Sequence, residues 1–163
     1  MNQCKERTFL SADKSYGVVL KSVALEVILV ECRKSKKTET GGILIGKYSD
    51  DHNCALVYEI SGPPRDSIRS ATSFERGNQG LKDLLSGRFK DPGYYYLGEW
   101  HFHPFSSPEP SGRDLSQIKD IATSALYKCP EPILLIIGGD PDEEWTVTAN
   151  VFVAGNIIRL QEG

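Results

Sequence analysis

The sequence predicts an α+β fold in which a mostly antiparallel sheet is flanked by helices. Apolar residues recur at helical spacing in two stretches, 22–33 and the segment from 111 to 126. Short runs of aromatic and β-branched residues, separated by turn-forming residues, predict strands around these helices. The 163 residues, of which 39% are hydrophobic, suffice for one sizeable core, so a single domain over 1–163 is expected.

The first part of the chain is expected to form a strand, a helix and a hairpin. A short strand is predicted over 16–20, and the apolar spacing in 22–33 favours a helix. Two apolar runs, 41–47 and 54–60, flank the turn-rich residues 49–53. The two runs therefore predict a hairpin.

The second part begins with a proline-rich stretch, 61–73, which predicts an irregular loop and a mobile segment on the substrate side. A helix is expected from about 74 to 85. The aromatic run 94–101 predicts a strand that ends near His103, because prolines follow it. An amphipathic helix begins at Ser111. Three closing strands are predicted over 133–137, 145–153 and 157–160, which makes six or seven strands and three helices in total.

Composition excludes several classes of protein. The net charge of -3 argues against a nucleic-acid-binding domain, because such domains are usually basic. No apolar stretch reaches the roughly 20 residues of a membrane span, and the polar amino terminus predicts a cytoplasmic protein. The four cysteines lie far apart without a C-x-x-C pair, so reduced packing thiols are expected. The basic run 33–37 is interpreted as complementing the negative end of the preceding helix.

Two of the three histidines fall in the segment His101-Phe102-His103-Pro104, and Ser111 and Asp114 follow shortly after it. Side chains alternate between the faces of a strand, so both imidazoles point the same way. A carboxylate in the first turn of the next helix could complete a His-His-Asp set with an open fourth position, which is typical of catalytic zinc. The segment therefore predicts a metal site.

The candidate residues, and two nearby acids, Glu39 and Glu99, can also be interpreted without a catalytic role. Ser111 and Asp114 form an S-x-x-D pair before an amphipathic helix, which is typical of an N-terminal cap. The histidines could be core residues with satisfied hydrogen bonds. Glu39 could be a surface acid that ends the basic run. Glu99 could support a metal ligand through a contact of its side chain, but as a neighbour on the alternate strand face it could equally be buried against the helix or exposed, and it is left without a role.

The segments ETGGILIG, GEWHFHP and S-x-x-D, in that order, resemble the signature of the JAB/MPN (JAMM) metallopeptidases. The resemblance implies the cytidine-deaminase-like fold of that family and hydrolysis of a peptide or isopeptide bond. It also implies that His101, His103 and Asp114 bind Zn²⁺. Glu39 would activate the attacking water, and Ser111 would stabilise the oxyanion.

Two segments look most like the bacterial branch of this family found in antiphage operons of the CBASS type: the motif GEWHFHP and the loop SGPPRDSIRSATSFERG. That resemblance implies a deconjugase that removes a cGAS-like nucleotidyltransferase, a CD-NTase, from targets to which an E1/E2-like fusion has joined it. The substrate would present an extended C-terminal tail, like a ubiquitin-like conjugate, beside a sheet edge, where the 61–90 segment could clamp it. Two alternatives stay open: a processing peptidase for a ubiquitin-like sulfur carrier, and a catalytically silent MPN binding module.

Overall fold

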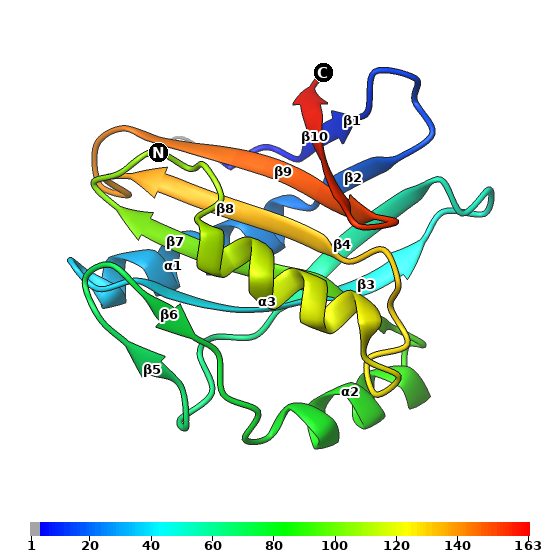
Figure 1. Cartoon of the computed structure of the whole chain (residues 1–163), viewed down its shortest axis with the longest axis horizontal. Helices are drawn as coiled ribbons and strands as arrows, with labels where there is room; N and C mark the ends of the chain where they lie inside the picture. The colour runs from blue at the N-terminus through cyan, green and yellow to red at the C-terminus, as the bar shows by residue number, and fades with distance from the viewer. Residues whose placement is uncertain (1–3) are drawn as a thin grey trace.

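A computed structural model describes residues 4–163, and in it eight strands close into a barrel in the order β1-β10-β9-β8-β7-β3-β4-β2 (Figure 1). The barrel strands are β1 (Arg7–Leu10), β2 (Gly17–Leu20), β3 (Thr40–Tyr48), β4 (Cys54–Ile60), β7 (Tyr95–Pro104), β8 (Ile133–Gly139), β9 (Trp145–Val153) and β10 (Asn156–Glu162). The short strands β5 (Ile68–Arg69) and β6 (Phe74–Glu75) pair outside it. The helices are α1 (Ser22–Ser35), α2 (Leu81–Lys90) and α3 (Gly112–Thr123).

The predicted α+β class and mostly antiparallel pairing are confirmed, but the expectation of a simple helix-flanked sheet was wrong. Among neighbouring barrel strands, only β2 with β4 and β7 with β8 run parallel. Strand β1, absent from the sequence prediction, pairs with both β2 and β10 and so closes the barrel. Its four residues are too few to show a clear strand periodicity.

The predicted helices over 22–33 and from 111 are confirmed as α1 and α3, but the helix expected over about 74–85 was wrong. Phe74 begins β6, and α2 starts only at Leu81. The carboxylate of Asp66 accepts hydrogen bonds from the backbone N–H groups of Asn78 and Gln79, at 3.0 and 2.9 Å. These bonds hold the chain in a turn where the sequence pattern favoured a helix.

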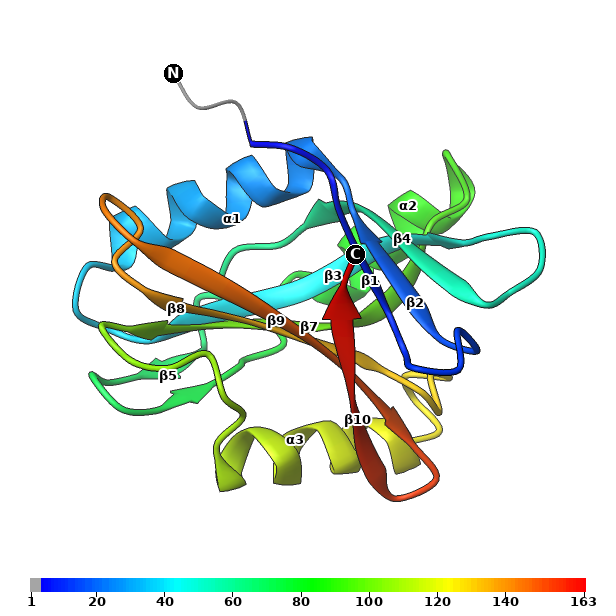
Figure 2. The ribbon, with the colours of Figure 1, turned by 90° about the horizontal axis from the view of Figure 1, so that it is seen from above.

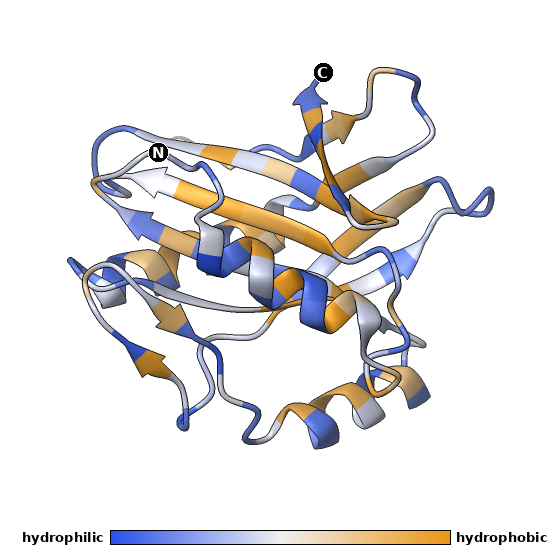
Figure 3. Ribbon diagram, in the orientation of Figure 1, coloured by the Kyte–Doolittle hydropathy of each residue, from blue (hydrophilic) through white to orange (hydrophobic). Residues whose placement is uncertain are grey.

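Side chains of β8 alternate between two cores on opposite sides of the strand. Leu135 and Ile137 belong to the core that includes α1, whereas Leu134 and Ile136 belong to the core that includes α3. Figure 2 shows α1 and α3 on opposite sides of the layer formed by β7, β8 and β9. Burial on both faces explains why β8 is hydrophobic along most of its length (Figure 3).

The neighbouring strand β7 follows the same alternation and thereby positions the candidate site. Trp100 and Phe102 lie in the core that includes α1. His101 pairs with Ile136 of β8, a residue of the core on the α3 side. Because alternate residues share a face, Glu99, His101 and His103 all face the α3 side. Polar residues therefore occupy β7 where α3 approaches it.

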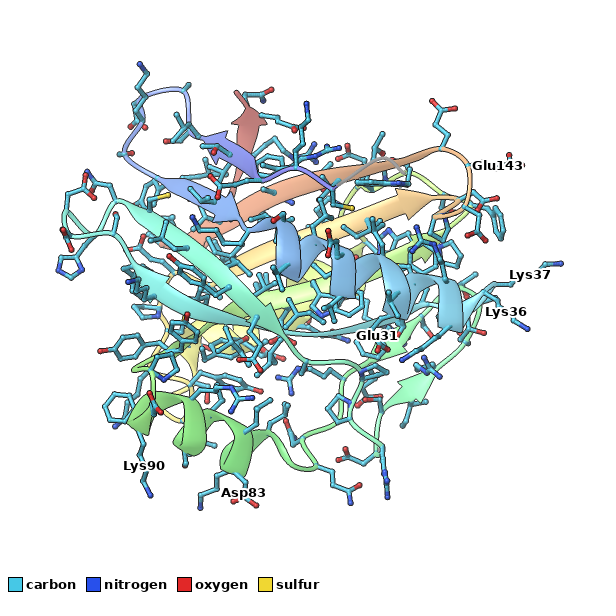
Figure 4. All side chains as sticks on the ribbon, turned by 180° about the vertical axis from the view of Figure 1, so that it is seen from behind. Glu31, Lys36, Lys37, Asp83, Lys90 and Glu143 are labelled. Carbon is cyan, nitrogen blue, oxygen red and sulfur yellow. The ribbon has the colours of Figure 1, made fainter. Side chains whose placement is uncertain are left out.

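The basic run 33–37 lies at the carboxyl end of α1, where the sequence interpretation placed it. Lys36 and Lys37 project from the chain just after α1, as Figure 4 shows, and Arg33 and Lys34 occupy the last turn of that helix. All four cysteines are free thiols. Within residues 4–163, no helix is both long enough and apolar enough to cross a membrane.

Candidate metal centre

Strand β7 and the first turn of α3 bring together His101, His103 and Asp114. One potential ligand atom from each residue lies within 4.8 Å of the others, and all three residues are buried. Nδ1 of His101 is 2.9 Å from Oδ1 of Asp114, and Nε2 of His103 is 3.1 Å from Oδ2 of the same carboxylate. The three residues that the sequence singled out as ligands thus form one cluster.

A capping box at the start of α3 sets the direction of the Asp114 side chain. The Ser111 hydroxyl oxygen accepts a hydrogen bond from the Asp114 backbone N–H at 3.1 Å, and Asp114 Oδ2 accepts one from the Ser111 backbone N–H at 2.8 Å. The N-cap interpretation of Ser111 is therefore confirmed. Because Ile118 and Ile121 anchor α3 in the core, the capped carboxylate is held against β7.

Hydrogen bonds at Nδ1 determine which nitrogen of each imidazole is available to a cation. Nδ1 of His103 lies 3.2 Å from the carbonyl oxygen of Ser107, and this nitrogen must donate because a carbonyl can only accept. Nδ1 of His101 likewise faces a carboxylate oxygen of Asp114. In the neutral rings, Nε2 therefore carries the free electron pair.

The lack of hydrogen-bond partners at two buried Nε2 atoms bears on whether this cluster fits a metal ion. Among the described residues, the Nε2 atoms of His101 and His103 are the buried side-chain nitrogen and oxygen atoms that have no hydrogen-bond partner. For His103, the 3.1 Å approach to Asp114 lacks hydrogen-bond alignment. Buried polar atoms are rarely left unsatisfied. Two imidazoles and one carboxylate suit Zn²⁺, although manganese, cobalt and iron accept similar ligands, so the cluster fits a metal site.

The Asp114 carboxylate and the His103 imidazole shift each other's pKa toward the charged forms. Burial alone would raise the pKa of the Asp114 carboxyl, but the hydrogen bond with His101 and the close approach of the His103 ring outweigh burial and hold this pKa far below its usual range. Burial opposes protonation of His103, yet the adjacent Asp114 carboxylate raises the pKa of that imidazole. The cluster therefore stabilises positive charge next to Asp114, as a cation site requires.

Glu39 lies at the entrance of β3, beside this cluster. The pairing of Thr40 with Phe102 places Glu39 near the level of His103. Its backbone N–H donates to the Ser70 carbonyl oxygen at 2.9 Å, and its side chain is half-buried. Burial raises the pKa of the Glu39 carboxyl, and the negative charge of Asp114 adds to this effect. A carboxylate with a raised pKa suits the role of general base.

Glu99 was assigned to the wrong face by the sequence interpretation. It shares the face of His101, is buried, and accepts hydrogen bonds from Arg76 and from the hydroxyl of Tyr96. The strand periodicity contained this signal, because residues 99 and 101 are two positions apart. No local pattern could indicate Arg76 as the partner, since 23 residues separate it from Glu99.

Comparison with known proteins is consistent with this geometry. Residues 21–149 match the family described as prokaryotic homologs of the JAB domain. A CD-NTase/cGAS isopeptidase of Enterobacter hormaechei subsp. hoffmannii is 45% identical over 159 residues, which cover 97% of this chain and 88% of that relative. The chain therefore belongs to the prokaryotic JAB family, and the resemblance to JAB/MPN peptidases is confirmed.

Two further proteins extend the comparison. A probable metalloprotease of Sinorhizobium fredii is 28% identical over 124 residues, which cover 74% of each chain. The solution structure of a Desulfitobacterium hafniense protein superimposes with a TM-score of 0.61 at 20% identity, covering 87% of this chain and 88% of the other. That structure shows a shared fold. Family membership, together with relatives named as an isopeptidase and a metalloprotease, makes this chain an enzyme of the hydrolase class.

Proposed function

We propose that this chain is a zinc-dependent isopeptidase that removes a CD-NTase from proteins to which it has been conjugated. The observation that carries the proposal is the buried cluster of His101, His103 and Asp114, with two unsatisfied Nε2 atoms and Glu39 beside it. The name of the Enterobacter relative supports the substrate. An E1/E2-like fusion would supply the conjugate.

In the proposed mechanism, a zinc ion held by His101, His103 and Asp114 would lower the pKa of water from 15.7 to about 7 and polarise the scissile carbonyl. Glu39 accepts the proton of the attacking water and delivers it to the leaving amine. The oxygen of the water forms a new C–O bond to the scissile carbon, which leaves an oxyanion on a tetrahedral carbon. The C–N bond breaks when this tetrahedral species collapses. The products are a free carboxyl group on the CD-NTase tail and a free amine on its former partner.

Ser111 is proposed to stabilise the oxyanion that develops on the scissile carbonyl. Its hydroxyl oxygen accepts from the Asp114 backbone N–H, so the hydroxyl proton stays available for donation. The residue is also exposed at the start of α3, where a substrate could reach it. A single donor in this role would contribute about 100- to 1,000-fold to turnover.

The substrate tail is proposed to lie in extended form along the β5–β6 pair. The barrel of the described chain is closed, so its strands do not offer an edge to an added strand. The β5–β6 pair stands outside the barrel, and Phe74 on β6 packs against His101. An extended tail beside this pair would therefore pass the metal centre.

The decisive experiment uses a conjugate in which a CD-NTase is joined through its C-terminal residue to a lysine of a second protein. The zinc-loaded enzyme should release both proteins with the masses expected for hydrolysis at that bond, read by intact mass spectrometry. Glu39→Ala and chelator-treated wild type are the controls, and both should leave the conjugate intact.

Failure of the loaded wild type to cut this conjugate would reject the proposed substrate. Cleavage of a sulfur-carrier precursor in the same assay would then support the processing-peptidase alternative. An inability of the wild-type protein to bind zinc would reject the metallopeptidase mechanism itself and favour a silent binding module.

A further inference from the structure

The segment 66–79, called here the β5–β6 hairpin, covers one side of the metal centre. The Ser70 carbonyl oxygen accepts from the Glu39 backbone N–H at 2.9 Å. The Phe74 ring meets the His101 ring edge-on, with centroids 5.2 Å apart and planes at 87°. The Gln117 side chain on α3 donates to the Phe74 carbonyl oxygen at 3.2 Å. The hairpin thus contacts the proposed base, one proposed ligand and the helix that carries another.

This hairpin has little ability to maintain its own structure. Each of its strands has two residues, and isolated two-stranded pairs are marginally stable at best. Its two ends are joined to each other, because Asp66 accepts from the backbone of Asn78 and Gln79, and the Ser67 hydroxyl accepts from the Gly77 N–H at 2.9 Å. These bonds close the neck of the hairpin without attaching it to the barrel.

Arg76 attaches the neck to the barrel through a buried ion pair. Its side chain is 5% exposed and its partner, Glu99, is 4% exposed. The guanidinium donates to Glu99 and to the Tyr127 hydroxyl, and the Tyr96 hydroxyl donates to the other oxygen of Glu99. Glu99 lies on β7, two residues before His101 and on the same face. The pair therefore joins the hairpin to the strand that carries the proposed ligands.

We infer that Arg76 is a positioning residue, whose ion pair with Glu99 holds the β5–β6 hairpin in register over the metal centre. This inference rests on the proposed function. Arg76 does not touch the reacting atoms and would act on them only through the hairpin. Buried ion pairs add little net stability compared with apolar replacements, but they can specify one arrangement of the chain. Here the specified arrangement is the placement of Ser70 against Glu39 and of Phe74 against His101.

The test compares two neutralised ion pairs. Arg76→Met combined with Glu99→Gln removes the buried pair without leaving an unpaired charge. Arg88→Met combined with Glu59→Gln removes a pair of the same chemistry whose side chains are 40% and 32% exposed. Trypsin, added under native conditions, reports the hairpin directly, because Arg65 lies just before its neck and Arg69 lies inside it.

The Arg76/Glu99 variant should be cut at Arg65 and Arg69 about tenfold faster than wild type, whereas the Arg88/Glu59 variant should be cut at the wild-type rate. Cobalt-substituted protein adds a second readout, since the visible spectrum of the bound ion reports ligand geometry. The spectrum should change in the first variant only. With an active conjugate, kcat should fall while KM changes less, because the hairpin would orient Glu39 and His101.

Tyr127→Phe provides a milder variant should the double substitution fail to fold. It removes only the hydroxyl that Arg76 contacts, and it should raise the cutting rate roughly fivefold. Wild-type cutting rates and cobalt spectra in the Arg76/Glu99 and Tyr127→Phe variants would overturn the inference. If wild type cleaves no CD-NTase conjugate, the proposed substrate fails, yet the proteolysis and cobalt readouts still decide the role of Arg76.

Discussion

Nδ1 of His101 and Oδ1 of Asp114 lie 2.9 Å apart, although the two residues belong to different elements and are 13 positions apart in the chain. His101 is held by pairing of β7 with β3 and β8, whereas Asp114 is held by the cap and the apolar anchor of α3. The proposed metal centre therefore depends on how α3 docks against β7.

Replacement of a proposed ligand should strongly weaken metal binding. His103→Ala and Asp114→Asn each remove one of the three donors, so purified protein should lose most of the zinc that wild type carries. Elemental analysis of protein dialysed against trace zinc provides the measurement. His52→Ala is the matched control, because His52 is the third histidine and is exposed in a turn. Equal zinc loss from the control would contradict the assignment.

Ser111 should affect turnover and stability through different atoms. Ser111→Ala should lower kcat by about 100- to 1,000-fold through loss of the oxyanion donor. It should also lower the free energy of unfolding by about 1 kcal/mol through loss of the cap.

Ser111→Gly separates the two effects. Glycine at an N-cap lowers the free energy of unfolding by only about a few tenths of a kcal/mol, and it supplies no hydroxyl. This variant should therefore be nearly as stable as wild type but as slow as Ser111→Ala. Glu39→Ala should be inactive. If Ser111→Ala were as inactive as Glu39→Ala, the proposed division of roles would be wrong.

Gly41 should tolerate no side chain. A Cβ atom there would lie 2.3 Å from the Trp100 carbonyl oxygen and 2.7 Å from the Phe74 ring. Gly41→Ala should therefore destabilise the fold by at least about 1–3 kcal/mol in denaturant titration, because backbone would have to move.

Gly87→Ala is the matched control for this substitution. Gly87 lies within α2, and a Cβ atom there would meet nothing within 4 Å. Alanine favours a helix interior, so this variant should be more stable than wild type by roughly 0.5–1 kcal/mol. A stable Gly41→Ala protein would show that β3 and β7 approach less closely than described.

The metal-free protein should lose stability as the pH rises above 6.5. Asp114 raises the folded-state pKa of His103 above its ordinary value of 6.5. The stability contributed by protonated His103 is then fully present below pH 6.5 and is lost as the pH rises through the folded-state pKa. The difference in Tm between wild type and His103→Asn should therefore shrink as the pH is raised.

Zinc should reverse this trend, because metal and proton compete for the same imidazole. In the presence of excess zinc, the Tm advantage of wild type over His103→Asn should grow with pH over the same range. A metal-free pH series in which the Tm difference stays constant would show that His103 gains no stability from Asp114.

Most of the local elements could be predicted from the sequence, and so could the membership of the candidate site. The helical spacing of apolar residues identified α1 and α3, and strand alternation placed His101 and His103 on one face. Where local patterns were ambiguous, prediction failed. Residues 74–85 look helical, but contacts with Asp66 and the packing of Phe74 on His101 kept their first part out of the helix.

Features that depend on neighbouring residues could be predicted without a structure: the H-x-H pair on a strand, the capping box of Ser111 and Asp114, and the amphipathic face of α3. Three other features depend on contacts between distant segments: the closure of the barrel by β1, the position of Glu39 beside His103, and the pairing of Arg76 with Glu99. Periodicity records which face a residue occupies. It contains no information about which distant segment covers that face, because that choice depends on the packing of the whole chain.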